Sequence, residues 1–455
     1  MALESINPYD GSHIKGYDEF SQEHLDATIG LTHNAWLSWG KTDFAERRKV
    51  LTGLAAALRR RKAELSQLMT KEMGKLYSSS EAEVEKCAWV CDYYAEKGEE
   101  HLFAQLIETD ASKSYVTFNP LGVVLAVMPW NFPFWQVFRF AAPAVMAGNA
   151  ALLKHASNVS GCALAIEDLF KDAGAPENLF RTLLIGGRRV PSVIEDPRVA
   201  AVTLTGSTEA GRSVGSTAGK MIKKSVLELG GSDPYIVLAD ADLDLASRTC
   251  VTSRMINGGQ SCIAAKRFIV VTEVAEEFTR RVVESMAAIS MGDPMDSETG
   301  LGPMARSDLR DELHDQVRRA VAAGAELLLG GKIPEGRGAF YPATVLTKVS
   351  AGNPAYSEEL FGPVATIMTA ADEADAIRIA NDSDFGLGAA VFTQDVARGE
   401  KIAATELQAG HCAVNALVKS DPRLPFGGVK ISGYGRELSW YGIKEFVNIK
   451  TVYVA

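Results

Sequence analysis

The sequence lacks any hydrophobic run long enough to cross a membrane. Its longest apolar run, from Leu121 to Met128, stops at Pro129 and is less than half of the roughly 20 residues that a spanning helix needs. The opening residues Met-Ala-Leu-Glu-Ser-Ile-Asn-Pro have neither a basic start nor an apolar core, so we expect no secretory signal. These absences exclude a membrane protein and predict no membrane partner.

Cysteine is scarce, with six residues in a chain of 455. Their spacing is not typical of a disulfide framework, and such sparse use indicates a reducing, cytoplasmic setting. Cys87 and Cys91 are one helical turn apart, but no His or further Cys lies near them in the sequence to complete a metal site. We therefore expect no disulfide framework and no bound metal.

Basic residues are outnumbered, because the chain has 47 Lys and Arg against 57 Asp and Glu, a formal net charge of -10. This balance disfavours non-specific binding to nucleic acid. The one basic cluster, Arg59 to Lys62, falls in an amphipathic helical pattern rich in Ala and Leu, so a solvated helix face explains it better than a nucleic-acid patch. We expect no nucleic-acid partner.

Apolar periodicity predicts a helical opening from about residue 21 to residue 107. Short β-branched runs then alternate with helical stretches, which is typical of a parallel, doubly wound sheet. The expected strands of this first series are Gly122–Met128, Ala150–Lys154, Phe180–Ile185, Val199–Thr205, Ser225–Leu229 and Tyr235–Ala239.

A second alternating series begins near Arg267. Its expected strands are Arg267–Thr272, Val364–Met368 and Ala389–Thr393, with helices at about 274–290, 306–323 and 373–381. The predicted fold class is therefore α/β, with two doubly wound parallel-sheet domains and an active site in the cleft between them. Ser114–Phe118 and Ile449–Ala455 read as strands without neighbours, so we expect a small β-ribbon that joins another subunit's sheet.

One cysteine stands out by its surroundings. The segment Asn257-Gly-Gly-Gln-Ser-Cys-Ile-Ala-Ala265 is a glycine-rich polar loop that presents Cys262 just before a strand. Cysteine is intrinsically nucleophilic, and backbone N–H groups or positive charge favour its thiolate. Cys262 is therefore a candidate nucleophile, and the alternative is an inert loop cysteine.

Two polar residues could assist such a nucleophile. Glu228, in Leu227-Glu-Leu-Gly-Gly231, ends an apolar strand and is a candidate general base, unless it is an ordinary solvent-facing strand end. Asn131 lies in Pro129-Trp-Asn-Phe-Pro133, where Pro133 suits the first turn of a helix. Its amide could stabilise an oxyanion by about 3–4 kcal/mol, or it could simply cap the helix.

The chain also lacks the G-x-G-x-x-G fingerprint of dinucleotide-binding folds. Instead, Leu204-Thr-Gly-Ser-Thr-Glu-Ala-Gly211 runs from a strand through a tight turn into a helix. Free N–H groups at that helix start could face a pyrophosphate, and Gly206 and Gly211 would permit close approach.

Together these four segments resemble the aldehyde dehydrogenase superfamily, from about residue 5 to the C-terminus. Leu153-Lys154, Glu359-Leu-Phe-Gly-Pro363 and Pro425-Phe-Gly-Gly-Val-Lys-Ile-Ser-Gly433 also match the family in order and spacing. The resemblance implies that Cys262 attacks an aldehyde carbon, that Asn131 and the Cys262 N–H hold the oxyanion, and that Glu228 activates the water that hydrolyses the thioester. Hydride goes to a nicotinamide.

The resemblance also implies how the chain is divided. Residues 1–109 and 120–229 would bind the dinucleotide, 230–436 would form the catalytic domain, and 110–119 and 437–455 would be oligomerisation segments of a homodimer or homotetramer. The implied cofactor-binding residues are Trp130, Lys154, Ser157, Thr205, Gly206, Ser207, Gly211, Leu229, Glu359 and Phe361. Among these, Glu359 would hold the nicotinamide ribose and Phe361 the ring.

Ser157 decides the expected cofactor. Family members that prefer NAD commonly carry a Glu three residues after the position of Lys154, where it binds the adenosine ribose, and this chain has Ser157 there. Without that carboxylate a 2′-phosphate is not repelled, and Lys154 supplies positive charge. We expect NADP in preference to NAD, with NAD still possible.

The helix after Pro133 carries Trp135 and Arg139 one turn apart, and a guanidinium beside a cavity suits a carboxylate. Arg139 and Ser420 match the positions at which succinate-semialdehyde dehydrogenases bind the distant carboxylate. The overall length and the run Lys154-His-Ala-Ser-Asn158 resemble the short bacterial type of these enzymes. Several relatives have a second arginine where this chain has Ile256, and Arg254 or Lys419 could compensate. The alternative for Arg139 is a surface or interdomain ion pair.

The expected substrate is a small aldehyde, succinate semialdehyde first. Two other possibilities stay open: a broad-specificity aldehyde dehydrogenase, and a homologue that kept the fold but lost activity. A coenzyme A-dependent acylating enzyme is disfavoured, because such relatives often lack the base and Glu228 is present.

Overall fold

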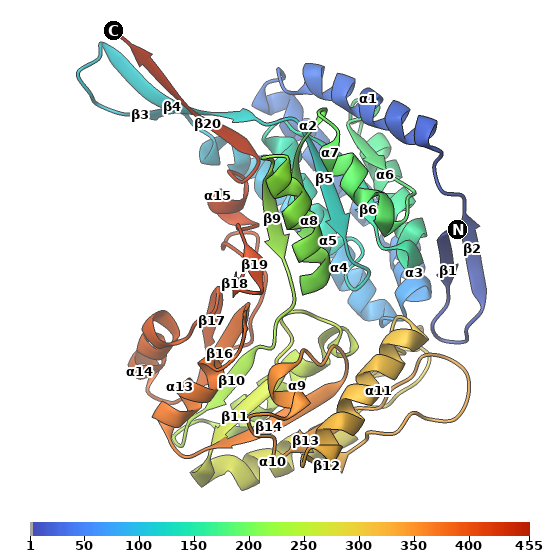
Figure 1. Ribbon diagram of the computed structural model, residues 1–455, viewed down its shortest axis with the longest axis vertical. Coiled ribbons are helices and arrows are strands. Elements are labelled where there is room, and N and C mark those ends of the chain that lie inside the picture. Colours follow the sequence, from blue (N-terminus) through green and yellow to red (C-terminus); the bar gives the residue numbers. More distant parts are fainter. Residues whose placement is uncertain (1–2) are drawn as a thin grey trace.

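The computed structural model describes residues 3–455 (Figure 1). The chain opens with a hairpin of β1 (Leu3–Ile6) and β2 (His13–Tyr17), which the sequence pattern did not predict. The predicted helical opening follows. It consists of α1 (Gln22–Trp39), α2 (Phe44–Arg60), α3 (Lys62–Met73) and α4 (Tyr77–His101). The predicted end at about residue 107 is wrong, since Gln105–Leu106 form strand β3.

The first large sheet has six strands in the order β19-β9-β8-β5-β6-β7. They are β5 (Val123–Met128), β6 (Ala150–His155), β7 (Phe180–Thr182), β8 (Val199–Thr205), β9 (Lys224–Glu228) and, at one edge, β19 (Gly433–Tyr434). All pairings are parallel except that of β19 with β9. The chain order therefore reverses between β5 and β8, where a doubly wound sheet opens a crevice at its carboxyl edge.

Helices of the first half pack around this sheet. They are α5 (Trp135–Met146), α6 (Ser160–Asp172), α7 (Val190–Glu195) and α8 (Thr208–Lys220), with a short 3-10 turn at Ser157–Val159. The opening helices extend this layer, because α2 and α4 both pack against α5. This half forms one continuous buried core.

The second large sheet has seven strands in the order β12-β13-β14-β11-β10-β16-β17, all parallel apart from β12. They are β10 (Pro234–Val237), β11 (Arg267–Val271), β12 (Glu326–Leu329), β13 (Thr344–Thr347), β14 (Val364–Ala370), β16 (Gly388–Phe392) and β17 (His411–Val414). Strand β10, expected at the end of the first series, belongs here. Two doubly wound sheets confirm the predicted fold class.

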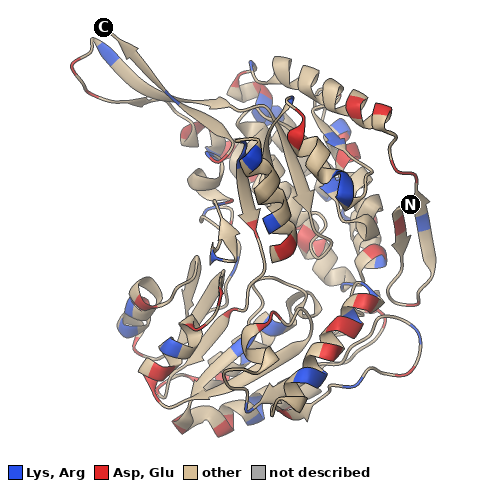
Figure 2. Ribbon diagram, viewed as in Figure 1, with Lys and Arg blue, Asp and Glu red and all other residues tan. Residues whose placement is uncertain are grey.

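The longer helices of the second half are α9 (Leu243–Met255), α10 (Thr272–Ala287), α11 (Ser307–Ala322), α13 (Glu373–Asn381) and α14 (Val396–Lys401). Shorter elements are α12 (Pro354–Ser357), α15 (Ser439–Gly442), β15 (Phe385–Gly386) and β18 (Val429–Lys430). Figure 2 shows acidic and basic residues interspersed along α11 and other outer helices. The basic cluster at the α2–α3 junction follows this pattern, since Arg59 pairs with Glu85 at 2.9 Å and Arg61 with Glu64 at 2.7 Å.

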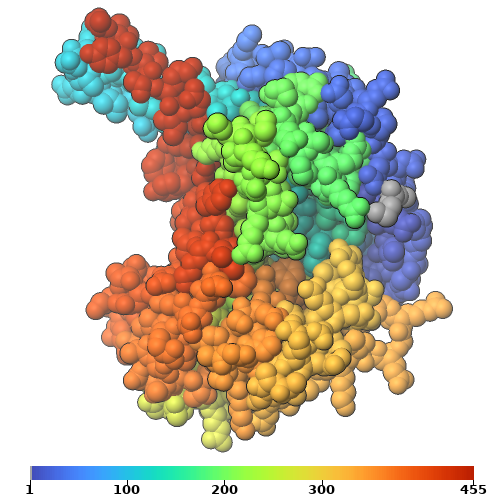
Figure 3. Space-filling view, in the orientation of Figure 1, coloured from blue at the N-terminus to red at the C-terminus, as the bar shows by residue number. Residues whose placement is uncertain are grey.

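The third sheet is the predicted ribbon. Strand β4 (Lys113–Pro120) pairs antiparallel with β20 (Val447–Val454) along its whole length, and β3 adds a third, short strand. The ribbon projects from the body as an arm (Figures 1 and 3). Among residues 3–455, no helix is both long and apolar enough to span a membrane.

The chain crosses between the two large sheets twice. It passes from β9 to β10 through residues 229–233, and it returns after β17 to add β19 beside β9 (Figure 1). The return segment belonged to the predicted catalytic domain of residues 230–436, yet its strand β19 extends the first sheet. A two-residue strand carries no sequence periodicity, so this crossing could not be expected.

Candidate active site

The Cys262 loop is held in an unusual backbone conformation. Before Cys262, the residues Asn257, Gly258 and Gly259 have φ values of 56°, 61° and 76°, in the left-handed region. A Cβ on Gly259 would lie 2.1 Å from the carbonyl oxygen of Gly362, so no other residue fits there. The loop therefore packs directly against the segment that follows Glu359.

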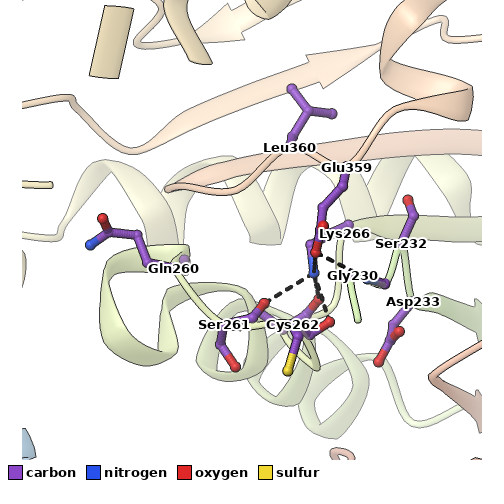
Figure 4. Close-up of polar contacts among 12 residues, drawn as sticks. Gly230, Ser232, Asp233, Gln260, Ser261, Cys262, Lys266, Glu359 and Leu360 are labelled. Carbon is purple, nitrogen blue, oxygen red and sulfur yellow. Dashed lines mark hydrogen bonds and ion pairs between the residues drawn. The ribbon is translucent and has the colours of Figure 1, made fainter. Parts of the chain in front are cut away.

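A buried lysine fastens the same two segments together. Lys266 Nζ donates hydrogen bonds to the carbonyl oxygens of Ser261 at 3.0 Å and Cys262 at 2.8 Å, and it pairs with Glu359 at 3.2 Å (Figure 4). The Cys262 sulfur points to the side opposite Glu359 (Figure 4). Lys266 thus fixes the backbone that presents the thiol. Sequence reasoning missed this residue, whose only signal was a lysine at the start of an apolar strand.

Two cavities meet at Cys262. A smaller one of about 280 Å³ lies along the first sheet, and a larger one of about 650 Å³ opens on the other side toward α4. Cys262 and Gln136 line both cavities. Cys262 therefore lies between the two cavities.

The smaller cavity lies at the crevice between β5 and β8. The predicted cofactor residues that line it are Trp130, Thr205, Gly206, Ser207, Leu229, Glu359 and Phe361. Ser207 also caps α8 by accepting a hydrogen bond from the Ala210 N–H at 3.2 Å. The Trp130 and Phe361 rings meet edge to face at 5.8 Å, and the carboxylate of Glu359 accepts from the Gly231 N–H at 3.0 Å.

Three predicted cofactor residues lie outside this cavity. Lys154 is near the carboxyl end of β6, and the exposed Ser157 begins the 3-10 turn that follows, whose other two residues are buried. Burial lowers the pKa of Lys154. A Cβ at Gly211 would meet the Leu229 side chain at 2.6 Å, so this glycine allows close packing against Leu229. The cofactor-binding roles of Lys154, Ser157 and Gly211 stay predictions.

Asn131 faces the nucleophile loop. Its Nδ2 donates to the backbone carbonyl oxygen of Gln260 at 3.1 Å, and the backbone carbonyl oxygen of Asn131 accepts from Asn257 Nδ2 at 2.7 Å. The alternative that Asn131 caps the following helix is wrong. Helix α5 begins only at Trp135, so Pro133 is not in its first turn, and the free N–H groups of Phe134 and Trp135 are bound by the Glu83 carboxylate at 2.9 Å.

Glu228 ends β9 as predicted, but it is not solvent-facing. Its side chain is buried, and both carboxyl oxygens lack a hydrogen-bond partner among residues 3–455. Burial and the neighbouring Glu437 carboxylate raise the pKa of Glu228 well above its usual range, and Arg139 opposes this. Glu228 lines neither cavity and faces Gly427 instead, so a role as general base at Cys262 would require its side chain to rotate.

Arg139 forms the ion pair that was the alternative to substrate binding. It is buried and pairs with Glu437, stacks over the Phe426 ring at 4.7 Å, and donates to Thr205 Oγ1 at 3.3 Å. Its side chain still lines the larger cavity together with Trp135, Lys419 and Ser420. Arg254 does not replace a second substrate arginine, because it is buried and donates to the Gly259 carbonyl oxygen at 2.5 Å.

Sequence reasoning missed two residues of the cavity walls. Gln136 is buried with its Oε1 unpartnered among the described residues, and Lys86 reaches the larger cavity from α4. Lys86 and Ser420 are 334 positions apart, so no local pattern could join them. Within residues 3–455, no cluster of three or more His, Cys, Asp or Glu could hold a metal ion.

Burial raises the pKa of the Cys262 thiol to about 11, while Arg139 and Lys266 act in the opposite direction. A raised pKa favours the neutral thiol, so we expect alkylation of Cys262 by iodoacetamide to accelerate about tenfold per pH unit between about pH 7 and 9. Peptide-resolved mass spectrometry measures this rate separately from that of Cys412, whose pKa burial also raises to about 11. A rate independent of pH would mean that Cys262 is already ionised.

Comparisons with known proteins agree with this geometry. Residues 1–452 match the model of the aldehyde dehydrogenase family. A probable succinate-semialdehyde dehydrogenase (NADP(+)) of Synechocystis sp. is 50% identical over 455 residues, covering 100% of both chains, and the succinate semialdehyde dehydrogenase (NAD(P)+) of Escherichia coli is 48% identical, covering 99% of this chain and 97% of its own.

A solved structure extends the comparison to three dimensions. The succinic semialdehyde dehydrogenase of Streptococcus pyogenes, in complex with NADP+, superposes with a TM-score of 0.97 at 39% identity and full coverage of both chains. Similarity of this extent covers both large sheets, the ribbon and every segment around Cys262. The chain therefore belongs to the aldehyde dehydrogenase family.

Proposed function

We propose that this protein oxidises succinate semialdehyde to succinate through a thioester on Cys262, with NADP as the hydride acceptor. The observation that carries the proposal is the position of Cys262 where the two cavities meet. An aldehyde in the larger cavity and a nicotinamide in the smaller one would then lie on either side of the same sulfur.

The residues around Cys262 suit covalent catalysis. The sulfur forms a bond to the aldehyde carbon, and the electron pair of the carbonyl moves onto its oxygen. One amide hydrogen of Asn131 binds the Gln260 carbonyl, which leaves its second hydrogen for that oxyanion, beside the Cys262 N–H. When bound, the nicotinamide accepts the hydride whose loss from the adduct creates the thioester.

Glu228 would act in the second half of the reaction. Its carboxylate removes a proton from water, the water oxygen bonds to the thioester carbon, and Cys262 leaves as thiolate. Gly427 makes room for the observed position of this carboxylate, because a Cβ there would lie 2.7 Å from Glu228 Oε1. With separate resting and working positions, the Glu228 carboxylate would lie away from the Cys262 thiol while the aldehyde binds.

The smaller cavity fits the nicotinamide end of a dinucleotide. It lies at the carboxyl ends of β5 and β8, beside the N-terminus of α8, where doubly wound folds bind such ligands. Farther along, the exposed Ser157 and the nearby Lys154 offer a hydroxyl and a cation to a 2′-phosphate, with no carboxylate at position 157 to repel it. The name of the Synechocystis relative, which gives NADP(+), supports this choice, whereas that of the Escherichia coli relative, NAD(P)+, includes both cofactors.

The larger cavity supports an aldehyde with a distant carboxylate. Three cationic side chains, those of Lys86, Arg139 and Lys419, reach its wall together with the hydroxyl of Ser420. Both sequence relatives described above carry succinate semialdehyde in their names. Of the remaining alternatives, a broad-specificity aldehyde dehydrogenase would have no use for this positive lining.

Steady-state kinetics of the full-length enzyme test the proposal directly. We expect kcat/KM for succinate semialdehyde to exceed that for butanal, an uncharged aldehyde of equal length, by at least about 100-fold, because charged hydrogen bonds recognise the carboxylate. We expect NADP to be preferred over NAD by at least about tenfold. Equal use of the two aldehydes would favour the broad-specificity alternative, and no reduction of either cofactor would favour an inactive homologue.

We further infer that the protein is a cytoplasmic homo-oligomer joined through its ribbon. Large apolar side chains stand out on that arm, with Leu106 75% exposed and Ile449 60% exposed. A projecting ribbon with free edges and apolar faces is suited to continue the sheet of another subunit. The six cysteines are free thiols, which fits a reducing compartment.

A further inference from the structure

Lys86 is placed unlike the other cations of the larger cavity. It extends from α4, and its Nζ donates to Ser420 Oγ at 2.8 Å and lies 4.2 Å from the centre of the Trp135 ring. Among residues 3–455 it forms no ion pair, although it is only half exposed. A partly buried ammonium without a carboxylate partner leaves its charge available to a ligand.

The charge of Arg139, by contrast, is compensated within the protein. Its guanidinium pairs with Glu437, one face stacks on Phe426, and Nη2 donates to Thr205. A carboxylate entering the cavity would have to compete with Glu437, which is buried and would be left unpaired. Arg139 therefore lines the cavity without being free to bind a second carboxylate closely.

Ser420 completes the arrangement around Lys86. Its Oγ accepts hydrogen bonds from Lys86 Nζ and from Trp135 Nε1, the latter at 3.1 Å. A hydroxyl that accepts twice keeps its own proton for donation, and the ammonium keeps two of its three hydrogens. All three side chains line the cavity that ends at Cys262, so these remaining donors lie at the cavity wall with no acceptor yet in place.

We propose that Lys86 and Ser420 together bind the carboxylate of the substrate, and that Lys86 is the residue that selects a charged aldehyde. This inference rests on the proposed function, because it names how the same substrate is recognised. The ammonium and the hydroxyl take the carboxylate, while Cys262 takes the aldehyde carbon at the other end of the cavity. The Trp135 indole contacts both donors, since its Nε1 donates to Ser420 and Lys86 Nζ lies over its ring.

Lys86→Met tests the proposal, because methionine keeps the length of the side chain and removes the charge. We expect KM for succinate semialdehyde to rise about tenfold or more, since a charged hydrogen bond is lost, while kcat changes less than about threefold. The kcat/KM for butanal should change less than about threefold, because butanal has no carboxylate. Lys86→Arg should restore most of the affinity, and Lys97→Met, the same change on the outer face of α4, should behave as wild type.

The outcomes distinguish failure of the role proposed for Lys86 from failure of the proposed function. If the wild type prefers succinate semialdehyde and Lys86→Met keeps the same KM, the role of Lys86 is refuted and the proposed function stands. If the wild type has no preference for succinate semialdehyde over butanal, both are refuted. If Lys86→Met and Lys86→Gln lose turnover with both aldehydes while NADP affinity is retained, Lys86 is structural and the proposal is overturned.

Discussion

Cys262→Ala is expected to lower kcat with succinate semialdehyde by about 10⁴-fold or more, because no covalent adduct can form without the sulfur. We expect this loss of activity at Cys262 and not at the other cysteines. Cys262 lines both cavities of the site, whereas Cys250 is fully buried. Initial rates of NADPH formation measure the effect.

The matched control is Cys412→Ala, the same change at the other half-buried cysteine, which lies on β17 away from both cavities. It should keep nearly full activity. Affinity for NADP, followed by protein fluorescence, should be unchanged in Cys262→Ala. Substantial turnover by Cys262→Ala, within about tenfold of wild type, would refute the thioester mechanism.

Glu228→Gln is expected to reduce steady-state kcat by about 10²- to 10⁴-fold, the usual contribution of a general base. The first turnover should survive, because bond formation at Cys262 and loss of hydride do not use this carboxylate. Rapid mixing should therefore show a burst of one NADPH per active site. Intact-mass spectrometry should then find the acyl group accumulated on the enzyme.

The burst of NADPH distinguishes a general-base role of Glu228 from a structural role. Glu276→Gln, the same change at an exposed position on α10, should leave both phases intact. Loss of the burst together with the steady state would mean that Glu228 acts before the thioester or supports the fold. Since burial and Glu437 raise the pKa of Glu228, the wild-type deacylation rate should increase with pH as the carboxyl ionises.

Much of the fold follows from local pattern. The strands expected at 122–128, 150–154 and 199–205 appear within about one residue as β5, β6 and β8, because each combines β-branched residues with clear turn signals. The family was likewise predicted, and the comparisons confirmed it. The hairpin β1–β2 and the strands β3, β12, β13, β15, β17, β18 and β19 were missed, since strands of two to five residues carry little periodic signal.

The site was only partly predictable, for a different reason. Cys262, Glu228 and Asn131 each sit in a short motif with its own chemical logic, so sequence alone singled them out, and their catalytic roles stay predictions. Lys86 and Lys266 have no such motif. Their importance depends on which groups the fold brings beside them, Ser420 for one and the Cys262 carbonyl for the other.

For Arg139, the sequence predicted the position of the side chain but not the residue with which it pairs. Its place on α5 was predicted, and it does reach the larger cavity. Its ion pair depends on Glu437, which lies 298 positions later and had no sequence signal of its own. A buried charge takes the nearest compensating charge, and that partner is decided by tertiary structure.

The two crossings between the large sheets restrict how the halves can move. A single linker would let one half twist, tilt and swing against the other, whereas two separate attachments leave rotation about the line that joins them as the easy motion. That line passes along the edge of β9, next to β19 and close to Glu228. We therefore expect the mouth of the crevice to widen when a dinucleotide is exchanged, while the groups nearest this axis, including Glu228 as the proposed general base, hardly change their spacing.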